Sequence, residues 1–327
     1  MLSAVTYSAI ESPSSDALNH LRACYTKMNI DDDPYVVHLR KTCSVLLEST
    51  ITKRNTYSQK NIGGLTRAAS ILETELGPWA SQYYVATCIS RFLESYKELA
   101  WLEGDDSDKS YMHTTLSGTN WEVPSPDALT GSHALSSKLT ELVRIITAEF
   151  STAATSGIVF VETRAQVHVL SAILDNLPET QELVRSVTFV GASNSYLKKG
   201  QMRELLDARH NDTAVEELRS GRKNLIICTS VCEEGIDISA CNLVVCFQPP
   251  PNLRSFVQRR GRARATTSKY IVMLPGDGTK DKALAQWLEL EKEMEAEYMS
   301  ETRKLEELKK LESEDDGYRE LFIESTG

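Results

Sequence analysis

The sequence predicts an α/β protein in which a parallel sheet carries helices on both faces, together with an all-helical domain and a C-terminal helical arm. Between residues 34 and 102 apolar side chains recur every three or four positions, which is typical of helices that bury one face. From residue 157 short apolar runs alternate with helical stretches, which is typical of a parallel sheet covered on both sides. After residue 280 apolar residues return at helical spacing among many Glu and Lys residues, which indicates a long charged helix.

The all-helical domain is predicted to span residues 31–102. Three segments place their apolar residues on one helix face: 34–52, 62–76 and 79–100. Gly77 and Pro78 separate the second segment from the third, because glycine commonly follows a helix end and proline suits the first turn of the next helix. Residues 1–30 are only weakly patterned, and no element is predicted there.

Residues 103–132 are predicted to be a linker, because acidic, glycine and proline residues interrupt any sustained period. The α/β domain is predicted at 133–278 and begins with an amphipathic helix at 134–150. Five apolar runs are expected to form its parallel sheet: 158–161, 187–190, 225–228, 243–246 and 270–274. Residues 279–327 are the acidic arm and tail, which either packs on its own domain as a solvated helix or docks a partner.

The charge distribution indicates a local phosphate site. The chain has 36 basic and 46 acidic residues, a net charge of −10, which argues against a simple nucleic-acid-binding domain. Residues 251–270 nevertheless contain several basic residues and no acidic one. The seven cysteines form no C-x-x-C pair, so buried reduced thiols are expected rather than zinc ligands or disulfides. No apolar run could span a membrane and no signal-peptide pattern is present, so a cytoplasmic location is expected, with the nucleus as the alternative.

The strongest chemical signal is the run Gln258-Arg259-Arg260-Gly261-Arg262-Ala263-Arg264. Arginine forks bind phosphate oxygens, and glycine lets the backbone turn tightly between them. An arginine-rich run alone is usually a solvated or generic anion-binding face. This one precedes the strand expected at 270–274, and we expect it at the carboxyl end of the sheet, where α/β folds place ligand loops.

A second signal follows the strand expected at 225–228. Thr229 and Ser230 place hydroxyls where they can bond phosphate or sugar, and Gly235 permits close approach of a ligand to the backbone. Asp237 could accept a hydrogen bond from a ribose hydroxyl. The alternative is that Thr229 or Ser230 only caps the following helix, and the pair Glu233-Glu234 is assigned no role beyond solvated charge.

These two segments, with their spacing, resemble motifs V and VI of superfamily 2 helicases. The run Val159-Phe160-Val161-Glu162-Thr163-Arg164 resembles their motif IV, and the stretch from Leu225 to Leu274 is most similar to the Dicer-like proteins of fungi and to their relatives, the viral-RNA sensor helicases. More weakly, Asp33-Pro34-Tyr35-Val36-Val37 and the region from Leu76 to Tyr84 are similar to the helical insertion of their second lobe. The acidic arm occupies the place of their pincer helices. The resemblance implies a RecA-like C-terminal helicase lobe with a helical insertion.

The resemblance also implies roles for single residues. The catalytic arginine would be Arg262, with Arg264 or Arg259 as a second one, and the position of Ala265 departs from the arginine that many helicases have there. The expected nucleotide contacts are Gly235, Asp237 and Gln258. The expected contacts to the RNA backbone are Thr163, Arg164, Gly191, Ser193, Thr229 and Ser230. The implied cofactor is ATP, shared with a first lobe, and the implied partner is double-stranded RNA.

The motor pattern is incomplete in this sequence. It contains no G-x-x-x-x-G-K-[ST] phosphate loop and no acidic metal-binding segment after a strand. We therefore expect the first helicase lobe and the nuclease domains to lie outside this chain, and the chain alone neither to hydrolyse ATP, nor to cut RNA, nor to bind Mg²⁺. The leading hypothesis is the motor lobe of an ATP-dependent double-stranded-RNA helicase within a Dicer-like endoribonuclease of RNA silencing or antiviral defence. The alternative is a catalytically silent RNA-binding or adaptor protein. A metabolic nucleotide-binding enzyme is disfavoured because no G-x-G-x-x-G follows a strand.

Overall fold

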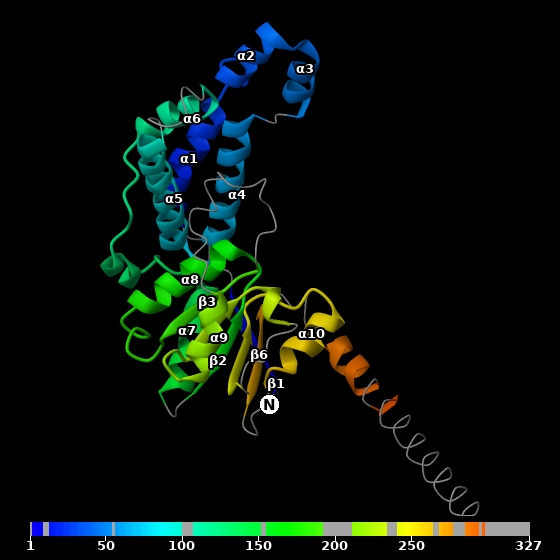
Figure 1. Ribbon diagram of the computed structural model, residues 1–327. Coiled ribbons are helices and arrows are strands. Elements are labelled where there is room, and N and C mark those ends of the chain that lie inside the picture. Colours follow the sequence, from blue (N-terminus) through cyan, green and yellow to red (C-terminus); the bar gives the residue numbers. More distant parts are fainter. Residues whose placement is uncertain are drawn as a thin grey trace, which may run out of the picture. The chain divides into compact units, whose positions relative to one another are not determined.

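The chain folds into two compact units in the computed structural model (Figure 1). The first contains Met1–Pro249 and Gln258–Gly276, and the second contains Pro250–Val257 and Asp277–Gly327. The structure describes residues 2–8, 13–53, 56–99, 107–151, 155–191, 211–233, 241–263, 268–276, 285–293 and 296–297. Within these ranges no helix is both long and apolar enough to cross a membrane.

A six-stranded sheet lies in the first unit, with every neighbouring pair parallel and the order β1-β6-β5-β2-β4-β3. The strands are β1 (Leu2–Tyr7), β2 (Gly157–Phe160), β3 (Ser186–Phe189), β4 (Leu225–Cys228), β5 (Leu243–Cys246) and β6 (Lys269–Pro275). The five predicted strands and the parallel sheet are confirmed. The sixth, β1, lies in the segment for which no element was predicted. It is an edge strand whose Val5 and Tyr7 are only half-buried, so its apolar pattern is weak, and pairing with β6 stabilises it.

Helices cover both faces of this sheet. Residues in one register row of a parallel sheet point to the same face, and Val159, Ile227 and Val245 share such a row and one core. Helices α7 (Ser137–Phe150) and α8 (Arg164–Asn176) contribute to that core. Helix α9 (Asn211–Arg219) contacts β3 and β4, but its buried residues do not belong to that core. Right-handed crossovers place α8 and α9 on opposite faces, so the predicted two-sided cover is confirmed.

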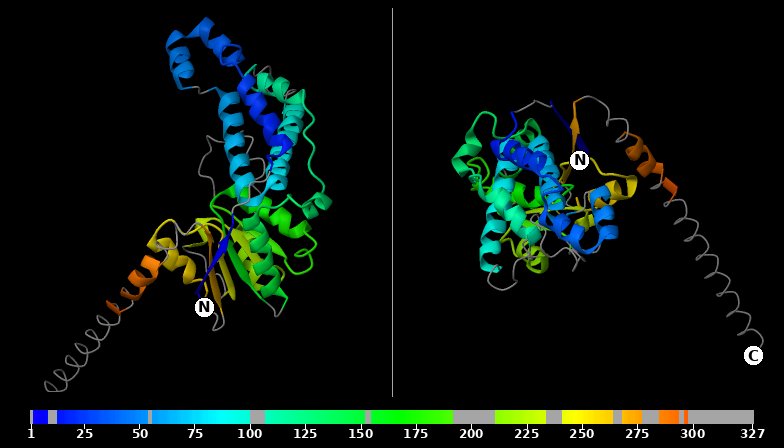
Figure 2. Two further views of the ribbon diagram at one scale, coloured as in Figure 1. Left: turned by 180° about the vertical axis from the view of Figure 1, so that it is seen from behind. Right: turned by 90° about the horizontal axis from the view of Figure 1, so that it is seen from above.

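The helical domain is a bundle around two long helices, α4 (Tyr57–Leu76) and α5 (Pro78–Leu99). Helix α1 (Asp16–Lys27) lies along both of them, as Figure 2 shows from behind. Two shorter helices, α2 (Pro34–Thr42) and α3 (Ser44–Lys53), contact each other. The predicted helices at 62–76 and 79–100 and the break at Gly77 are confirmed: Gly77 has φ 114°, and a Cβ there would lie 2.5 Å from the carbonyl oxygen of Ala134. The segment 34–52, predicted to place its apolar residues on one helix face, is instead two helices, because the backbone is extended at Cys43 between α2 and α3.

Two helices and a 3₁₀ turn were not predicted. Helix α1 lies in the weakly patterned segment 1–30, and the stretch predicted as a linker, 103–132, contains α6 (Ser107–Ser117) and the turn η1 (Pro126–Thr130). Helix α6 buries Met112 and Leu116 fully. Two apolar residues four positions apart are enough to dock a short helix on a bundle, but they are too few to form a readable period.

The second unit contains the first part of α10 (Leu253–Arg260) and the described part of the C-terminal arm. Residues 285–293 are helical there, as predicted, and the rings of Phe256 and Trp287 lie 6.0 Å apart between their centroids. The remainder of the predicted helix at 280–312 lies largely outside the described residues.

Candidate functional site

The turn after β2 is built around a capping box. The Thr163 hydroxyl accepts from the Gln166 backbone N–H at 3.2 Å, and the Gln166 side-chain oxygen accepts from the Thr163 backbone N–H at 2.9 Å. The hydroxyl of Thr163 also donates to Gln166 Oε1 at 3.1 Å. This arrangement satisfies the first amide groups of α8 and fixes the turn. Gln166 is fully buried, and its T-x-x-Q spacing was the signal from which the sequence could have revealed it.

The ends of three neighbouring strands meet beside this turn. The guanidinium Nη2 of Arg164, after β2, donates to the carbonyl oxygen of Gly191, after β3. A Cβ on Gly191 would lie 2.7 Å from Cγ2 of Val231, in the turn η4 (Ser230–Glu233) that follows β4. Five predicted RNA contacts therefore lie together at the carboxyl ends of β2, β3 and β4: Thr163, Arg164, Gly191, Thr229 and Ser230. Of these, Ser230 is exposed, and Ser193 lies outside the described residues.

Arg259 is enclosed in the first unit. It is 6% exposed, its Nε donates to Glu233 Oε1 at 2.7 Å, and its guanidinium carbon lies 4.9 Å from the centroid of the Phe160 ring. Burial opposes the charge, yet the neighbouring Cys246 and Glu233 leave the pKa of Arg259 above its ordinary value. The guanidinium is held as a buried cation by its carboxylate partner and by the aromatic face.

Arg262 lies one turn further on and is only half-buried. Its Nη2 donates to the backbone carbonyl oxygen of Glu233 at 2.6 Å. Its own carbonyl oxygen accepts from the Cys241 N–H at 3.4 Å, and Cys241 precedes β5. The expectation that the whole arginine run lies at the carboxyl end of the sheet is therefore wrong for the backbone of Arg262, although its guanidinium reaches the turn that follows β4. The connection from β5 to the parallel strand β6 must return to the amino end of the sheet, and α10 carries the run along with it.

Glu233 is a residue of this site that sequence reasoning missed. The prediction of solvated charge is wrong for it, because it is 9% exposed and holds both arginines, one through its carboxylate and the other through its backbone carbonyl. No spacing rule connects Glu233 with Arg259, since 26 residues separate them. Gln258 is half-buried on α10. The predicted residues Gly235, Asp237 and Arg264 lie outside the described residues.

Buried neutral groups surround the Arg259–Glu233 pair. The thiol of Cys246 donates to the Tyr270 hydroxyl oxygen at 3.2 Å. Burial raises the pKa of the Cys246 and Cys228 thiols and of the Tyr270 hydroxyl, so all three stay protonated near neutral pH. The prediction that the thiols are buried is confirmed for the lobe, where four cysteines are buried. Within the described ranges, no three His, Cys, Asp or Glu side chains gather as a metal site.

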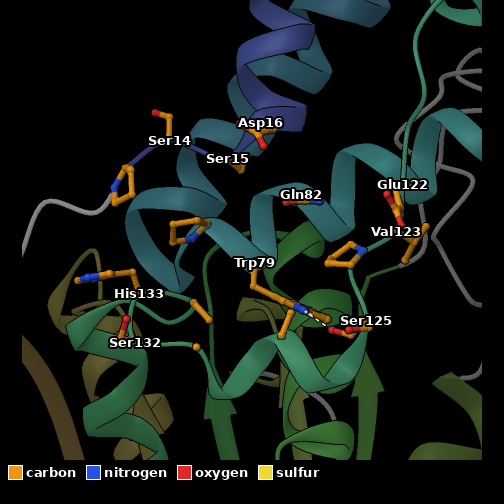
Figure 3. A pocket seen from close by; sticks show the side chains of 16 residues that line it. Ser14, Ser15, Asp16, Trp79, Gln82, Glu122, Val123, Ser125, Ser132 and His133 are labelled. Carbon is orange, nitrogen blue, oxygen red and sulfur yellow. Dashed lines mark hydrogen bonds between the residues drawn. The ribbon is translucent and has the colours of Figure 1, made fainter.

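A separate cavity of about 730 Å³ opens between the start of α5 and the segment that leads to α7 (Figure 3). Trp79 forms part of its wall, donates through Nε1 to the Ser125 carbonyl oxygen at 3.1 Å, and stacks on Tyr83 with 4.9 Å between ring centroids. None of the predicted site residues lines this cavity.

Comparison with known proteins gives a consistent assignment. Residues 137–266 match the family described as helicase conserved C-terminal domain. The chain is 36% identical over 329 residues to Dicer-like protein 2 of Neosartorya fischeri, covering 96% of this chain and 23% of that relative. It is 36% identical over 304 residues to Dicer-like protein 2 of Pyricularia oryzae, covering 91% and 20%. It is 37% identical over 326 residues to Dicer-like protein 2-1 of Aspergillus niger, covering 96% and 23%.

The chain therefore spans between 20% and 23% of the length of these relatives. The matched range contains β2 to β5, the turn at Thr163, and Arg259 with its partner Glu233. Residues 137–266 form a helicase C-terminal domain, and the chain is a helicase lobe of the Dicer-like type.

Proposed function

We propose that this lobe is the second half of an ATP-dependent motor that acts on double-stranded RNA within a Dicer-like endoribonuclease. The observation that carries the proposal is the meeting of three strand ends through Arg164, Gly191 and Val231. This end of the sheet offers backbone groups, short hydroxyl side chains and the Arg164 guanidinium, which is bonded to the Gly191 carbonyl oxygen. Such a set of groups suits a duplex that is recognised through its shape, phosphates and 2′-hydroxyls.

We assign the nucleotide contact to Arg262 and Arg264 rather than to Arg259. Arg259 is enclosed with Glu233, whereas Arg262 is only half-buried. When ATP is bound between two lobes, a positioned guanidinium stabilises the charge that develops on the transferred phosphoryl group. Arg259 then acts as a positioning residue, because it holds the side chain of Glu233, whose backbone carbonyl holds Arg262.

The RNA assignment is tested with fluorescence anisotropy on a blunt RNA duplex, its single strand and the matched DNA duplex, at several salt concentrations. A single lobe touches few phosphates, so the dissociation constant is expected in the range of about 10⁻⁶ to 10⁻⁴ M, with a shallow salt slope. Arg164→Ala should weaken duplex RNA binding about ten-fold or more, close to the loss of one hydrogen bond to a charged group. Arg144→Ala is the control, because Arg144 is exposed on α7 and pairs with Glu141 of the same helix.

Equal affinity for all three nucleic acids, unchanged by Arg164→Ala, would mean that this end of the sheet is only a generic basic patch.

The nucleotide assignment is tested in a polypeptide that joins this lobe to its phosphate-loop lobe. There Arg262→Ala should lower kcat for RNA-stimulated ATP hydrolysis by about 10³, the effect of losing an arginine finger. RNA binding without any effect of Arg262→Ala on hydrolysis would favour the silent adaptor instead.

A further inference from the structure

A buried lysine joins the helical domain to the lobe. Lys138 on α7 is 3% exposed and forms an ion pair with Glu75 on α4. Its ammonium lies 4.3 Å from the centroid of the Phe247 ring and 5.3 Å from that of Tyr7. Aromatic faces attract a cation, but a buried ammonium also needs an anionic partner in place of water. Glu75 supplies that charge from the other domain.

Glu75 has a second partner in the lobe. Gln248, two residues after β5, donates through Nε2 to Glu75 Oε2 at 3.2 Å. The other end of the same amide, Gln248 Oε1, accepts from the Glu162 backbone N–H at 3.1 Å. Glu162 directly precedes Thr163, so it belongs to the turn that carries the proposed RNA contacts. A side-chain amide has both a donor and an acceptor, and Gln248 uses one on each neighbour.

The backbone around Glu75 is fixed against the lobe as well. The Ser136 hydroxyl donates to the Glu75 carbonyl oxygen at 2.7 Å, and the Ser136 N–H donates to the Leu76 carbonyl oxygen at 3.0 Å. The close approach at Gly77 leaves no room for a side chain at the same point. The end of α4 therefore cannot move away from the start of α7 without breaking several hydrogen bonds.

We infer that Gln248 is a positioning residue that couples the helical domain to the turn 162–164, with Glu75 as the point of attachment. A displacement of α4 moves the Glu75 carboxylate that accepts from Gln248 Nε2, so the Gln248 side chain must move as well. Its Oε1 then shifts relative to the Glu162 N–H that donates to it. A glutamate at 248 would repel Glu75, and an apolar residue would leave both neighbours without this partner. The consequence for RNA rests on the function proposed above, whereas the coupling itself does not.

The experiment measures hydrogen exchange at the Glu162 amide in the whole chain without RNA. Gln248→Ala and Glu75→Ala should each raise its exchange rate about five-fold relative to the Val161 amide, close to the net loss of one hydrogen bond. The effect is limited because Gln166 Oε1 also accepts from the Glu162 N–H, at 3.2 Å. The Val161 N–H donates to the Cys228 carbonyl oxygen at 2.9 Å and corrects for any general loss of stability.

Glu73→Ala is the matched control. Glu73 lies on α4 two residues before Glu75, but its carboxylate accepts from Ser14 Oγ at 2.7 Å and from the Ser15 N–H at 2.9 Å, at the start of α1. This variant should leave the Glu162 amide unchanged. An unchanged rate in either Gln248→Ala or Glu75→Ala, or an equal rise in Glu73→Ala, would overturn the coupling. Glu75→Ala should also weaken duplex RNA binding about three-fold, and absence of RNA binding in the wild type would contradict the proposed function alone.

Discussion

Two buried ion pairs lie on opposite faces of the sheet, near the carboxyl ends of β2 and β5. On one face Arg259 pairs with Glu233 above the ring of Phe160. On the other face Lys138 pairs with Glu75 beside the ring of Phe247. The two phenylalanines are neighbours across the sheet, since the Phe247 N–H donates to the Phe160 carbonyl oxygen at 2.9 Å. The molecule therefore contains a cation that is paired with a carboxylate beside a phenylalanine ring at two places, once inside the helicase C-terminal domain and once at the attachment of the helical domain.

The difference lies in how completely each pair excludes water. The side chains of Arg259 and Glu233 are 7% and 9% exposed, whereas those of Lys138 and Glu75 are 4% and 25% exposed. The arginine fork bonds its carboxylate in a fixed direction, which suits a pair that must also hold Arg262 in place. Lysine is a point charge that tolerates small changes of angle. The lysine pair can therefore keep its attraction when the direction of the Glu75 carboxylate changes slightly.

The arginine pair should be the more costly one to break. Arg259→Met leaves the Glu233 carboxylate buried without its cation, so we expect a loss of about 3–5 kcal/mol in the free energy of unfolding. Urea unfolding of the whole chain, followed by circular dichroism, measures this loss as a shift of the midpoint at constant slope.

The double variant Arg259→Met with Glu233→Leu distinguishes two contributions to the lost stability. One is the loss of the attraction between the two side chains, and the other is the cost of leaving the Glu233 carboxylate buried without a cation. Because it removes both charges and keeps apolar volume, it should be more stable than Arg259→Met alone. If the double variant were instead the less stable of the two, other contacts of the Glu233 side chain would outweigh the removal of its unpaired charge.

The lysine pair should cost less. Lys138→Met keeps the packing against Phe247 but strands a carboxylate that is already a quarter exposed and can regain water. We expect a loss of about 2 kcal/mol, below the range for fully buried pairs. Lys269→Met is the control, because Lys269 is 44% exposed and pairs with Glu149 at the surface. It should cost at most about 1 kcal/mol in the same urea titration. Equal losses in the two lysine variants would mean that burial of Lys138 contributes nothing to its pair.

These two pairs also mark how far the sequence can be interpreted. The apolar runs predicted five strands of the sheet correctly, because buried parallel strands are continuous apolar segments. The arginine run and the turn at Thr163 were found because they are compact in sequence. Glu233, Gln248 and Lys138 were not found, since each acquires its role from a partner far along the chain. Lys138 lies 63 residues from Glu75, and no periodicity or motif connects them.

The strand β1 and the helix α6 were missed for a different reason. Among their described residues each buries few apolar side chains, and each is stabilised by a surface that the rest of the chain provides. Local patterns predict elements that bury a whole face, and they fail where a partner supplies most of the burial.

The smallest expected effect is a change in the reactivity of buried thiols, which should follow loss of the Arg259–Glu233 pair but not loss of the Lys138–Glu75 pair. Cys228 and Cys246 are fully buried on the arginine face, and burial raises the pKa of both thiols. Only the thiolate reacts with iodoacetamide, so at pH 8 these cysteines should react mainly when that face opens. Arg259→Met should raise the labelling of Cys246 about five-fold relative to Cys88, which is fully buried on α5 and reports general unfolding. Lys138→Met should leave this ratio unchanged.

Mass spectrometry of the labelled peptides measures the labelling of Cys246 relative to Cys88. The pH dependence of labelling at a third thiol, Cys241, shows whether the native or the unfolded protein is being labelled. Burial raises the pKa of Cys241 to about 11, against an ordinary value of 9.0. At pH 8 roughly one Cys241 thiol in a thousand is then ionised, and its labelling should keep rising about ten-fold per pH unit until the pH nears 11. In the unfolded chain the rise should end near pH 9. A plateau near pH 9 in the native protein would show that labelling reports global unfolding. The Cys246 ratio could then not distinguish the two faces, and the separate action of the two ion pairs would rest on the unfolding energies alone.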